Sequence, residues 1–200
     1  MRCLWLTRIL PQRMDAGDLI YSGKLMRAVA RNGVEVVCVG FGHPSVDCDR
    51  KNGDSITWLP ISGQPKSRLR ALFSKYPLET ARRATDGYRK TVRELLDQGG
   101  WDLVVIDHFG MGWITDVLGA SQTGGTTVVY ISHNFESTVS NDIADSFQRS
   151  WIEKRVLRFN AVKTANLEQR LTSRCDRLAA ITEEDASRYQ DLSPPRAPIV

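Results

Sequence analysis

Short runs of apolar, largely β-branched residues alternate along this chain with longer stretches of helical periodicity, and this alternation limits the possible folds. The apolar runs occupy residues 2–7, 34–39, 56–61, 103–106, 126–131 and 178–181. Continuous apolar strands are typical of a parallel sheet that helices cover on both faces. Alternating strands and helices indicate parallel strands joined by crossover helices. The sequence therefore predicts an α/β fold with a Rossmann-like parallel sheet flanked by helices.

Several local signals predict where the helices begin and end. Asp18 is a candidate N-cap of the first helix, and Gly33 stands where the end of that helix favours a left-handed residue. Pro77 separates two helical stretches, and a capping arrangement at Thr182 opens the last helix. Residues 141–174 contain neither glycine nor proline, which predicts one long helix or two helices joined by a bend.

The length of 200 residues is enough for one α/β domain with a sizeable core. We expect this domain to occupy residues 1–192. A proline-rich turn and two β-branched residues follow at 193–200, which we interpret as the start of a linker to a second domain.

Composition narrows the class of protein. Apolar residues make up 42% and charged residues 25%, as in ordinary globular proteins. No apolar run approaches the roughly 20 residues that a membrane-spanning helix needs, and the amino terminus lacks the features of a secretory signal, so we expect a cytoplasmic protein. The four cysteines show no Cys-x-x-Cys spacing, which favours free thiols, with Cys3 and Cys38 in the core.

Four segments, taken together in their order and spacing, resemble group 1 glycosyltransferases. They are Asp15-Ala16-Gly17-Asp18 with the helix and strand that follow it, Trp101-Asp102-Leu103-Val104-Val105-Ile106-Asp107-His108, Tyr130-Ile131-Ser132-His133-Asn134-Phe135-Glu136, and Ala179-Ala180-Ile181-Thr182. The resemblance implies the amino-terminal, acceptor-side domain of a retaining GT-B enzyme. Such an enzyme moves a sugar from a nucleotide diphosphate sugar to a glycan or lipid-linked glycan, in the synthesis of cell-surface polysaccharide or glycolipid. It also implies that no metal or cofactor is needed, that a carboxy-terminal domain holds most of the donor, and that this domain alone is inactive.

The loop at Ala16 and Gly17 lies between the first strand and the first helix. It lacks both the Gly-x-Gly-x-x-Gly pattern of dinucleotide sites and the Gly-Lys-Ser/Thr ending of a nucleotide-phosphate loop, so NAD and ATP are disfavoured. From the residues alone, an ordinary turn is as good an interpretation as an anion site at the helix N-terminus. The resemblance implies that Ala16 and Gly17 face the donor diphosphate.

His133 follows a predicted parallel strand, at the sheet edge where such folds bind their ligands. An imidazole there can bind a sugar hydroxyl or transfer a proton, although the residues alone favour a purely structural histidine. The resemblance makes His133 the predicted catalytic residue. We assign acceptor contacts to four neighbours, for which strand capping or loop stabilisation is the alternative: Asp107, His108, Asn134 and Glu136.

Residues 66–93 carry nine Lys and Arg against two acidic residues, whereas the whole chain has a net charge of +4. An apolar stripe accompanies these charges at Leu69, Leu72, Phe73 and Tyr76. This combination is typical of an interfacial helix at an anionic membrane. The predicted membrane contacts are Arg68, Arg70, Arg82 and Arg83. The alternative is that the stripe packs on the sheet and the charges face solvent.

Two other kinds of function remain open from the sequence. A sugar-nucleotide epimerase could share this fold, because fold does not determine chemistry. A non-catalytic basic module could bind anionic lipid or nucleic acid, but the basic region has few aromatic residues that could stack on bases, so nucleic acid is disfavoured. A hydrolase is disfavoured because no Gly-x-Ser-x-Gly motif is present.

Overall fold

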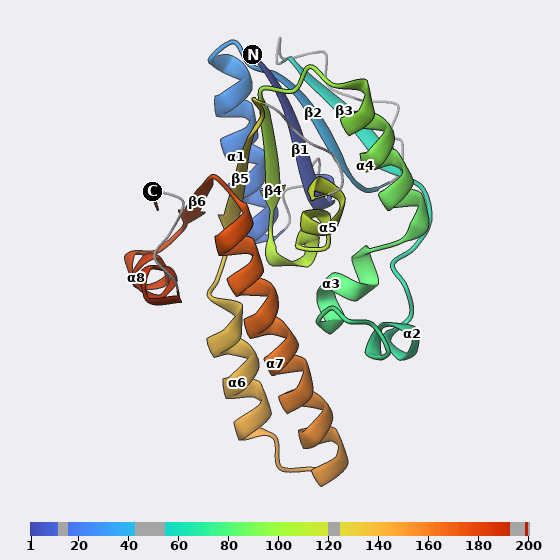
Figure 1. The fold of residues 1–200 in the computed structure, drawn as a ribbon, viewed down its shortest axis with the longest axis vertical. Helices are drawn as coiled ribbons and strands as arrows, with labels where there is room; N and C mark the ends of the chain where they lie inside the picture. The colour runs from blue at the N-terminus through green and yellow to red at the C-terminus, as the bar shows by residue number, and fades with distance from the viewer. Residues whose placement is uncertain (12–15, 43–54, 120–124, 193–198, 200) are drawn as a thin grey trace.

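A computed structural model describes residues 1–11, 16–42, 55–119, 125–192 and 199 of the protein (Figure 1). Its centre is a six-stranded sheet in the order β3-β2-β1-β4-β5-β6, and every neighbouring pair is parallel. The strands are β1 (Arg2–Ile9), β2 (Glu35–Phe41), β3 (Ile56–Ile61), β4 (Leu103–Asp107), β5 (Thr127–Ser132) and β6 (Arg177–Ala180). The predicted Rossmann-like α/β fold is confirmed. The strand order reverses between β1 and β4, and in such sheets ligands bind beyond the carboxyl ends of the strands at this point.

Eight α-helices and a short 3₁₀ helix connect the strands within the described residues. They are α1 (Gly17–Arg31), α2 (Arg68–Leu72), α3 (Leu78–Arg83), α4 (Asp86–Gln98), η2 (Phe109–Met111), α5 (Ile114–Leu118), α6 (Glu136–Ser146), α7 (Trp151–Arg174) and α8 (Glu183–Leu192). In Figure 1, α1 lies on one face of the sheet, α4 and α5 lie on the other, and α6 and α7 form a hairpin that extends beyond the sheet.

The core has two layers because successive side chains of a strand point to opposite faces. Leu4 and Leu6 of β1 belong to the cluster beneath α4, α5 and the carboxyl half of α7. Cys3 and Trp5 belong to the cluster that α1 covers with Met26. These four side chains of β1 are at most 1% exposed. Burial on both faces of the sheet explains why the sequence of such a strand is a continuous apolar run.

The helix boundaries confirm some of the sequence predictions and correct others. Gly33 has a positive φ of 82°, as predicted for the end of α1. Asp18 is not the N-cap: Ala16 takes that position without a side-chain hydrogen bond, and Asp18 lies in the first turn. The basic segment forms three helices rather than two, because the Thr85 hydroxyl accepts a hydrogen bond from the Tyr88 amide at 3.3 Å and opens a new helix, α4.

The long stretch without glycine or proline forms two helices joined by residues 147–150. The Ser150 hydroxyl caps α7 by accepting a hydrogen bond from the Glu153 amide at 3.4 Å. Thr182 caps α8 as predicted, since its hydroxyl accepts a hydrogen bond from the Asp185 amide at 3.1 Å.

Cys3, Cys38 and Cys175 are buried free thiols, and Cys48 lies outside the described residues. Within the part of the chain that the structure describes, no helix is long and apolar enough to cross a membrane. Most of the predicted linker at 193–200 also lies outside that part. Only Ile199 is described, in a parallel bridge with Leu178, so the linker stays a prediction.

Candidate functional site

The carboxyl edge of the sheet brings together polar side chains from segments far apart in the sequence. Arg8 lies near the end of β1, His108 directly follows β4, and His133 directly follows β5. The amino-terminal ends of α1 and α6 lie at the same edge, because each of these helices follows a strand of the parallel sheet. Both histidines thus lie where a doubly wound sheet presents its ligand site.

A buried chain of hydrogen bonds holds His133. Its Nε2 lies 2.8 Å from Oδ1 of Asp107, and the other carboxylate oxygen of Asp107 accepts a hydrogen bond from the Trp5 indole at 2.8 Å. The side chain of His133 is 6% exposed and that of Asp107 is fully buried. The Tyr21 ring packs edge-on against the imidazole, with ring centroids 5.7 Å apart.

This arrangement determines which imidazole nitrogen of His133 carries the proton. An ionised carboxylate only accepts hydrogen bonds, so the Asp107 contact requires a proton on Nε2 of His133. In the neutral ring, Nδ1 then keeps its lone pair and can accept a hydrogen bond from a hydroxyl. Asp107 therefore fixes the orientation of the His133 ring and favours the tautomer with the proton on Nε2.

The same contacts argue against a direct acceptor contact by Asp107. Both carboxylate oxygens have partners inside the protein, and the residue has no exposed surface. The structure thus corrects the prediction that Asp107 touches an acceptor, and places it behind His133 instead.

His108 lies beside His133, with ring centroids 5.4 Å apart. It has a positive φ of 82°, the only such non-glycine residue in the described chain. Its Nδ1 accepts a hydrogen bond from the Gly110 amide at 2.9 Å. Burial and the nearby charge of Arg8 lower the pKa of His108 from 6.5 to about 4. The ring is therefore neutral at physiological pH, and its Nε2 carries a proton that it can donate.

Arg8 supplies positive charge at this edge and was not among the predicted site residues. Its guanidinium forms an ion pair with Asp18 in the first turn of α1 and lies 3.9 Å from a carboxylate oxygen of Glu79. Burial acts to raise the pKa of Asp18, but the hydrogen bond and charge of Arg8 outweigh it, so the pKa is lowered overall. The rule that polar residues at strand ends form the site could have found Arg8; nothing in the sequence marks Glu79.

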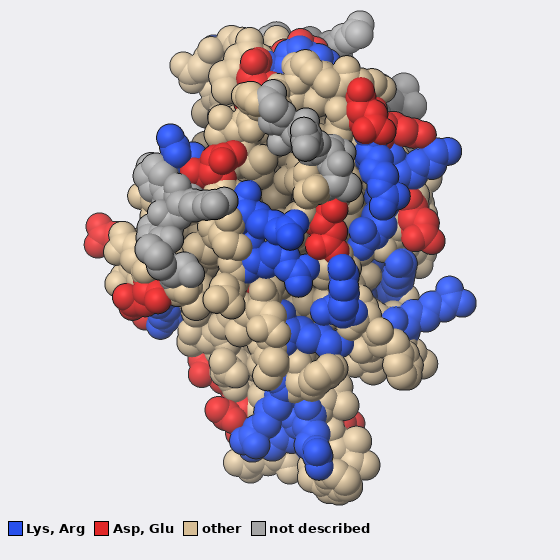
Figure 2. Space-filling model, viewed as in Figure 1, with Lys and Arg blue, Asp and Glu red and all other residues tan. Residues whose placement is uncertain are grey.

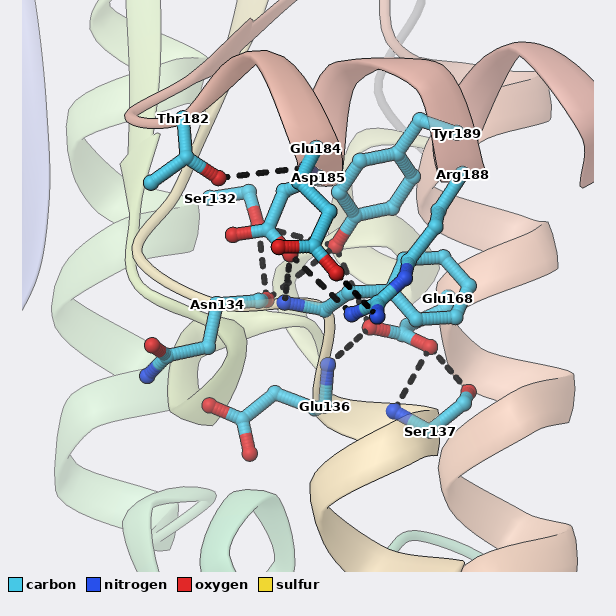
Figure 3. Close-up of polar contacts among 11 residues, drawn as sticks. Ser132, Asn134, Glu136, Ser137, Glu168, Thr182, Glu184, Asp185, Arg188 and Tyr189 are labelled. Atoms are coloured by element: carbon cyan, nitrogen blue, oxygen red, sulfur yellow. Dashed lines mark hydrogen bonds and ion pairs between the residues drawn. The ribbon is translucent and has the colours of Figure 1, made fainter.

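The loop after His133 is held by acids from two other helices (Figure 3). Glu168 of α7 accepts hydrogen bonds from the amides of Glu136 and Ser137 at 2.6 and 3.0 Å. The Phe135 amide donates to Asp185 of α8 at 3.3 Å. These carboxylates satisfy the amide groups at the start of α6, a role that a local cap residue usually fills.

The predicted acceptor residues of this loop differ in their surroundings. Asn134 is exposed, and its carbonyl accepts a hydrogen bond from the Ser132 hydroxyl at 2.8 Å. Glu136 is half-buried, and burial together with the charge of Glu168 raises the pKa of Glu136. Both side chains remain candidates for contact with a ligand.

At Gly17 the first helix begins without obstruction. A Cβ atom added there would have no neighbour within 4 Å. Glycine is therefore not required at this position for packing, and space remains beside the amino terminus of α1. This is compatible with the predicted anion contact at Ala16 and Gly17.

Comparison with known proteins identifies the family. Residues 20–200 match the family described as "Glycosyl transferase 4-like domain". The chain belongs to this glycosyltransferase family. No match among curated protein sequences reaches significance.

Solved structures of larger proteins share the fold of this glycosyltransferase domain. Sucrose-phosphate synthase from Thermosynechococcus elongatus superposes with a TM-score of 0.70 at 12% identity, over 100% of this chain and 47% of that one. A ugt transferase from Siraitia grosvenorii, solved in complex with UDP, superposes with a TM-score of 0.55 at 8% identity, over 99% of this chain and 50% of that one. The chain thus spans about half the length of each. At these identities the likeness shows the fold alone, and that fold fits the amino-terminal half of a GT-B glycosyltransferase.

The basic segment of this glycosyltransferase domain is only partly available to a membrane. Arg68 and Arg70 are exposed on α2. Arg82 is half-buried and donates from Nε to the Lys66 carbonyl at 3.2 Å. Arg83 is 9% exposed and pairs with Glu79 at 2.8 Å, so its predicted membrane contact is wrong.

The residues of the apolar stripe in this segment also differ in exposure. Leu69 and Phe73 are 73% and 92% exposed, whereas Tyr76 is buried. Leu69 and Phe73 therefore do not pack on the sheet, so the alternative that the whole stripe packs there is excluded.

Within the described residues, no group of His, Cys, Asp and Glu side chains is arranged to hold a metal ion. Asp47 and Asp49, which are spaced as an Asp-x-Asp pair, lie in a segment that is not described.

Proposed function

We propose that this chain is the acceptor-side domain of a retaining glycosyltransferase, which transfers a sugar from a nucleotide diphosphate sugar to a glycan or lipid-linked glycan. Reaction would take place between the carboxyl edge of this sheet and a second, donor-binding domain. The observation that carries the proposal is the buried hydrogen-bonded series Trp5–Asp107–His133, which fixes an imidazole at the edge where doubly wound sheets bind ligands.

Each group at the edge has a role in this proposal. Nδ1 of His133 accepts a hydrogen bond from a sugar hydroxyl, and the neutral His108 donates one from Nε2. Asn134 and Glu136 contact the acceptor from the start of α6. The amino terminus of α1 at Ala16 and Gly17, with Arg8 beside it, stabilises the negative charge that grows on the departing nucleoside diphosphate. This charge stabilisation needs no metal or cofactor.

We further propose that the enzyme works in the cytoplasm, in the synthesis of cell-surface polysaccharide or glycolipid. The buried free thiols of Cys3, Cys38 and Cys175 support a reducing compartment.

The test is His133→Ala in the full-length protein, assayed for transfer and for slow hydrolysis of uridine- and guanosine-diphosphate sugars. We expect turnover to fall about 10²-fold, the usual scale for losing a positioned catalytic group. The variant should stay folded in circular dichroism, although it loses about 1–3 kcal/mol of stability because the buried Asp107 loses a hydrogen-bond partner. Asp107→Asn keeps the shape but not the charge, and it should alter the pH profile of turnover as well as its size. Near-normal turnover of the His133 variant would make the residue structural.

Two further measurements separate the alternatives. Conversion of a sugar nucleotide into its epimer without transfer, detected by NMR, would identify an epimerase. For the 200-residue chain alone we expect at best millimolar binding of sugar nucleotides in isothermal titration, because one wall of the site is insufficient to orient the donor. Micromolar binding would contradict the half-site proposal.

A further inference from the structure

An apolar groove lies between α2 and the amino-terminal half of α7. Its volume is about 570 Å³. Its lining includes exposed apolar side chains from both walls, among them Leu72, Phe73, Trp151, Ile152, Val156 and Phe159. Phe73, Trp151 and Phe159 are 92%, 71% and 61% exposed. Exposed aromatic side chains grouped in this way usually mark an interaction site.

The groove is a fixed feature of the fold. The Lys163 ammonium of α7 donates to the carbonyls of Leu72 and Ser74, at 3.2 and 2.6 Å. The Leu78 amide donates to the Asn160 side chain at 2.7 Å. These hydrogen bonds join the segment around α2 to α7. They fix the positions of the two walls whose apolar side chains line the groove.

Positive charge surrounds the groove. Arg155 and Lys163 are among its lining residues, and Arg68 and Arg70 are exposed on the adjacent α2. The sequence from residue 66 to residue 78 contains no acidic residue. Figure 2 shows Lys and Arg side chains gathered along this face of the molecule. A partner surface therefore has to be apolar and negatively charged.

This chemistry discriminates between the possible occupants. A second copy of the chain, which has a net charge of +4, would bring like charges together around the groove. An anionic bilayer provides both acyl chains for the aromatic residues and phosphates for the arginines, and aromatic and basic residues suit the membrane interface.

We propose that the groove between α2 and α7 is a docking surface for an anionic lipid bilayer. Phe73, Trp151 and Phe159 insert among the acyl chains, and Arg68 and Arg155 lie against lipid phosphates. The surface uses none of the residues at the sheet edge, so it does not depend on the proposed transfer reaction.

The test is sedimentation of the chain with phosphatidylglycerol vesicles, and with phosphatidylcholine vesicles for comparison. We expect binding to phosphatidylglycerol that weakens as salt rises, and little binding to phosphatidylcholine. Phe73→Ser with Phe159→Ser should abolish binding at low salt. The matched control, Val139→Ser with Ile143→Ser, changes two exposed α6 residues that do not line the groove and should bind normally.

A second pair of variants tests the charges. Each basic residue at an anionic surface contributes about a fivefold change in affinity, so Arg68→Ser with Arg155→Ser should weaken binding about 30-fold. Lys90→Ser with Arg93→Ser removes the same charge from exposed positions on α4 and should have little effect.

Three outcomes would overturn the proposal: no sedimentation of the unchanged chain, equal losses in the groove variants and their controls, or dimers in analytical ultracentrifugation that Phe73→Ser with Phe159→Ser dissociates. The last result would assign the groove to a second copy. Circular dichroism of each variant confirms that it is folded, and the charge variants supply the answer should the apolar pair fail to fold.

Discussion

Replacing Glu168 by alanine removes the acceptor that holds the start of α6. The carboxylate accepts hydrogen bonds from two backbone amides, of Glu136 and Ser137, and from the hydroxyls of Ser137 and Tyr189. Tyr189 keeps a partner in Ser132 at 2.8 Å, so the main loss falls on the two amides. An unsatisfied buried donor costs about 1–3 kcal/mol.

The expected loss in the free energy of unfolding is smaller than the sum of these costs. Glu168 is fully buried, and burial raises its pKa, so removing the carboxylate also removes an unfavourable desolvation. The net loss should be about 2–4 kcal/mol. For a chain of this size that corresponds to a fall of about 5–15 °C in the melting temperature.

The assay is urea unfolding of the 200-residue chain followed by circular dichroism. Gln169→Ala, at the exposed neighbouring position on the same helix, is the control and should change stability by less than about 0.5 kcal/mol. In a double-mutant cycle with Ser137→Ala, the two losses should not add, because the residues share hydrogen bonds. A loss below about 0.5 kcal/mol for Glu168→Ala, or full additivity, would refute the assignment of Glu168 as the cap of α6.

Three other predictions concern residues at the carboxyl edge of the sheet. The ring of His108 should stay neutral in NMR titrations down to about pH 5, because its pKa in the folded protein is about 4. This pKa is lower than the ordinary 6.5, so the stability that His108 contributes is fully present above pH 6.5 and is lost as the pH falls toward 4. Protonation of His108 with a midpoint above pH 6 would contradict its burial beside Arg8. Trp5→Phe removes a hydrogen bond to the buried Asp107 and should lower stability by about 2 kcal/mol in urea unfolding, whereas an unchanged midpoint would show that the bond contributes nothing. Gly17→Ala should leave the melting temperature within about 2 °C, because its added Cβ meets no protein atom, and in the full-length enzyme it should weaken donor binding if a diphosphate lies there.

The pattern of the strands was predictable because parallel strands are buried on both faces. Each predicted strand lies within about two residues of the observed one, and Gly33 and Thr182 take their predicted roles at helix ends. The placement of His108 and His133 at one edge followed from the same rule, since both directly follow a strand. The prediction for Asp18 was wrong because a carboxylate at a helix start can cap the helix or pair with a distant arginine, and only the position of Arg8 decides between these roles.

The sequence by itself thus determined the order of strands and helices, the histidines at the sheet edge and the family, all of which depend on local periodicity and short motifs. The tertiary structure alone decided which polar groups have partners. It placed Asp107 behind His133 and joined Arg83 to Glu79. It also set Glu168 against the start of α6, 32 residues before it in the sequence. The physical reason is that burial, ion pairing and the exposure of apolar side chains depend on which distant segments come into contact. The pattern of neighbouring residues in the sequence does not predict those contacts.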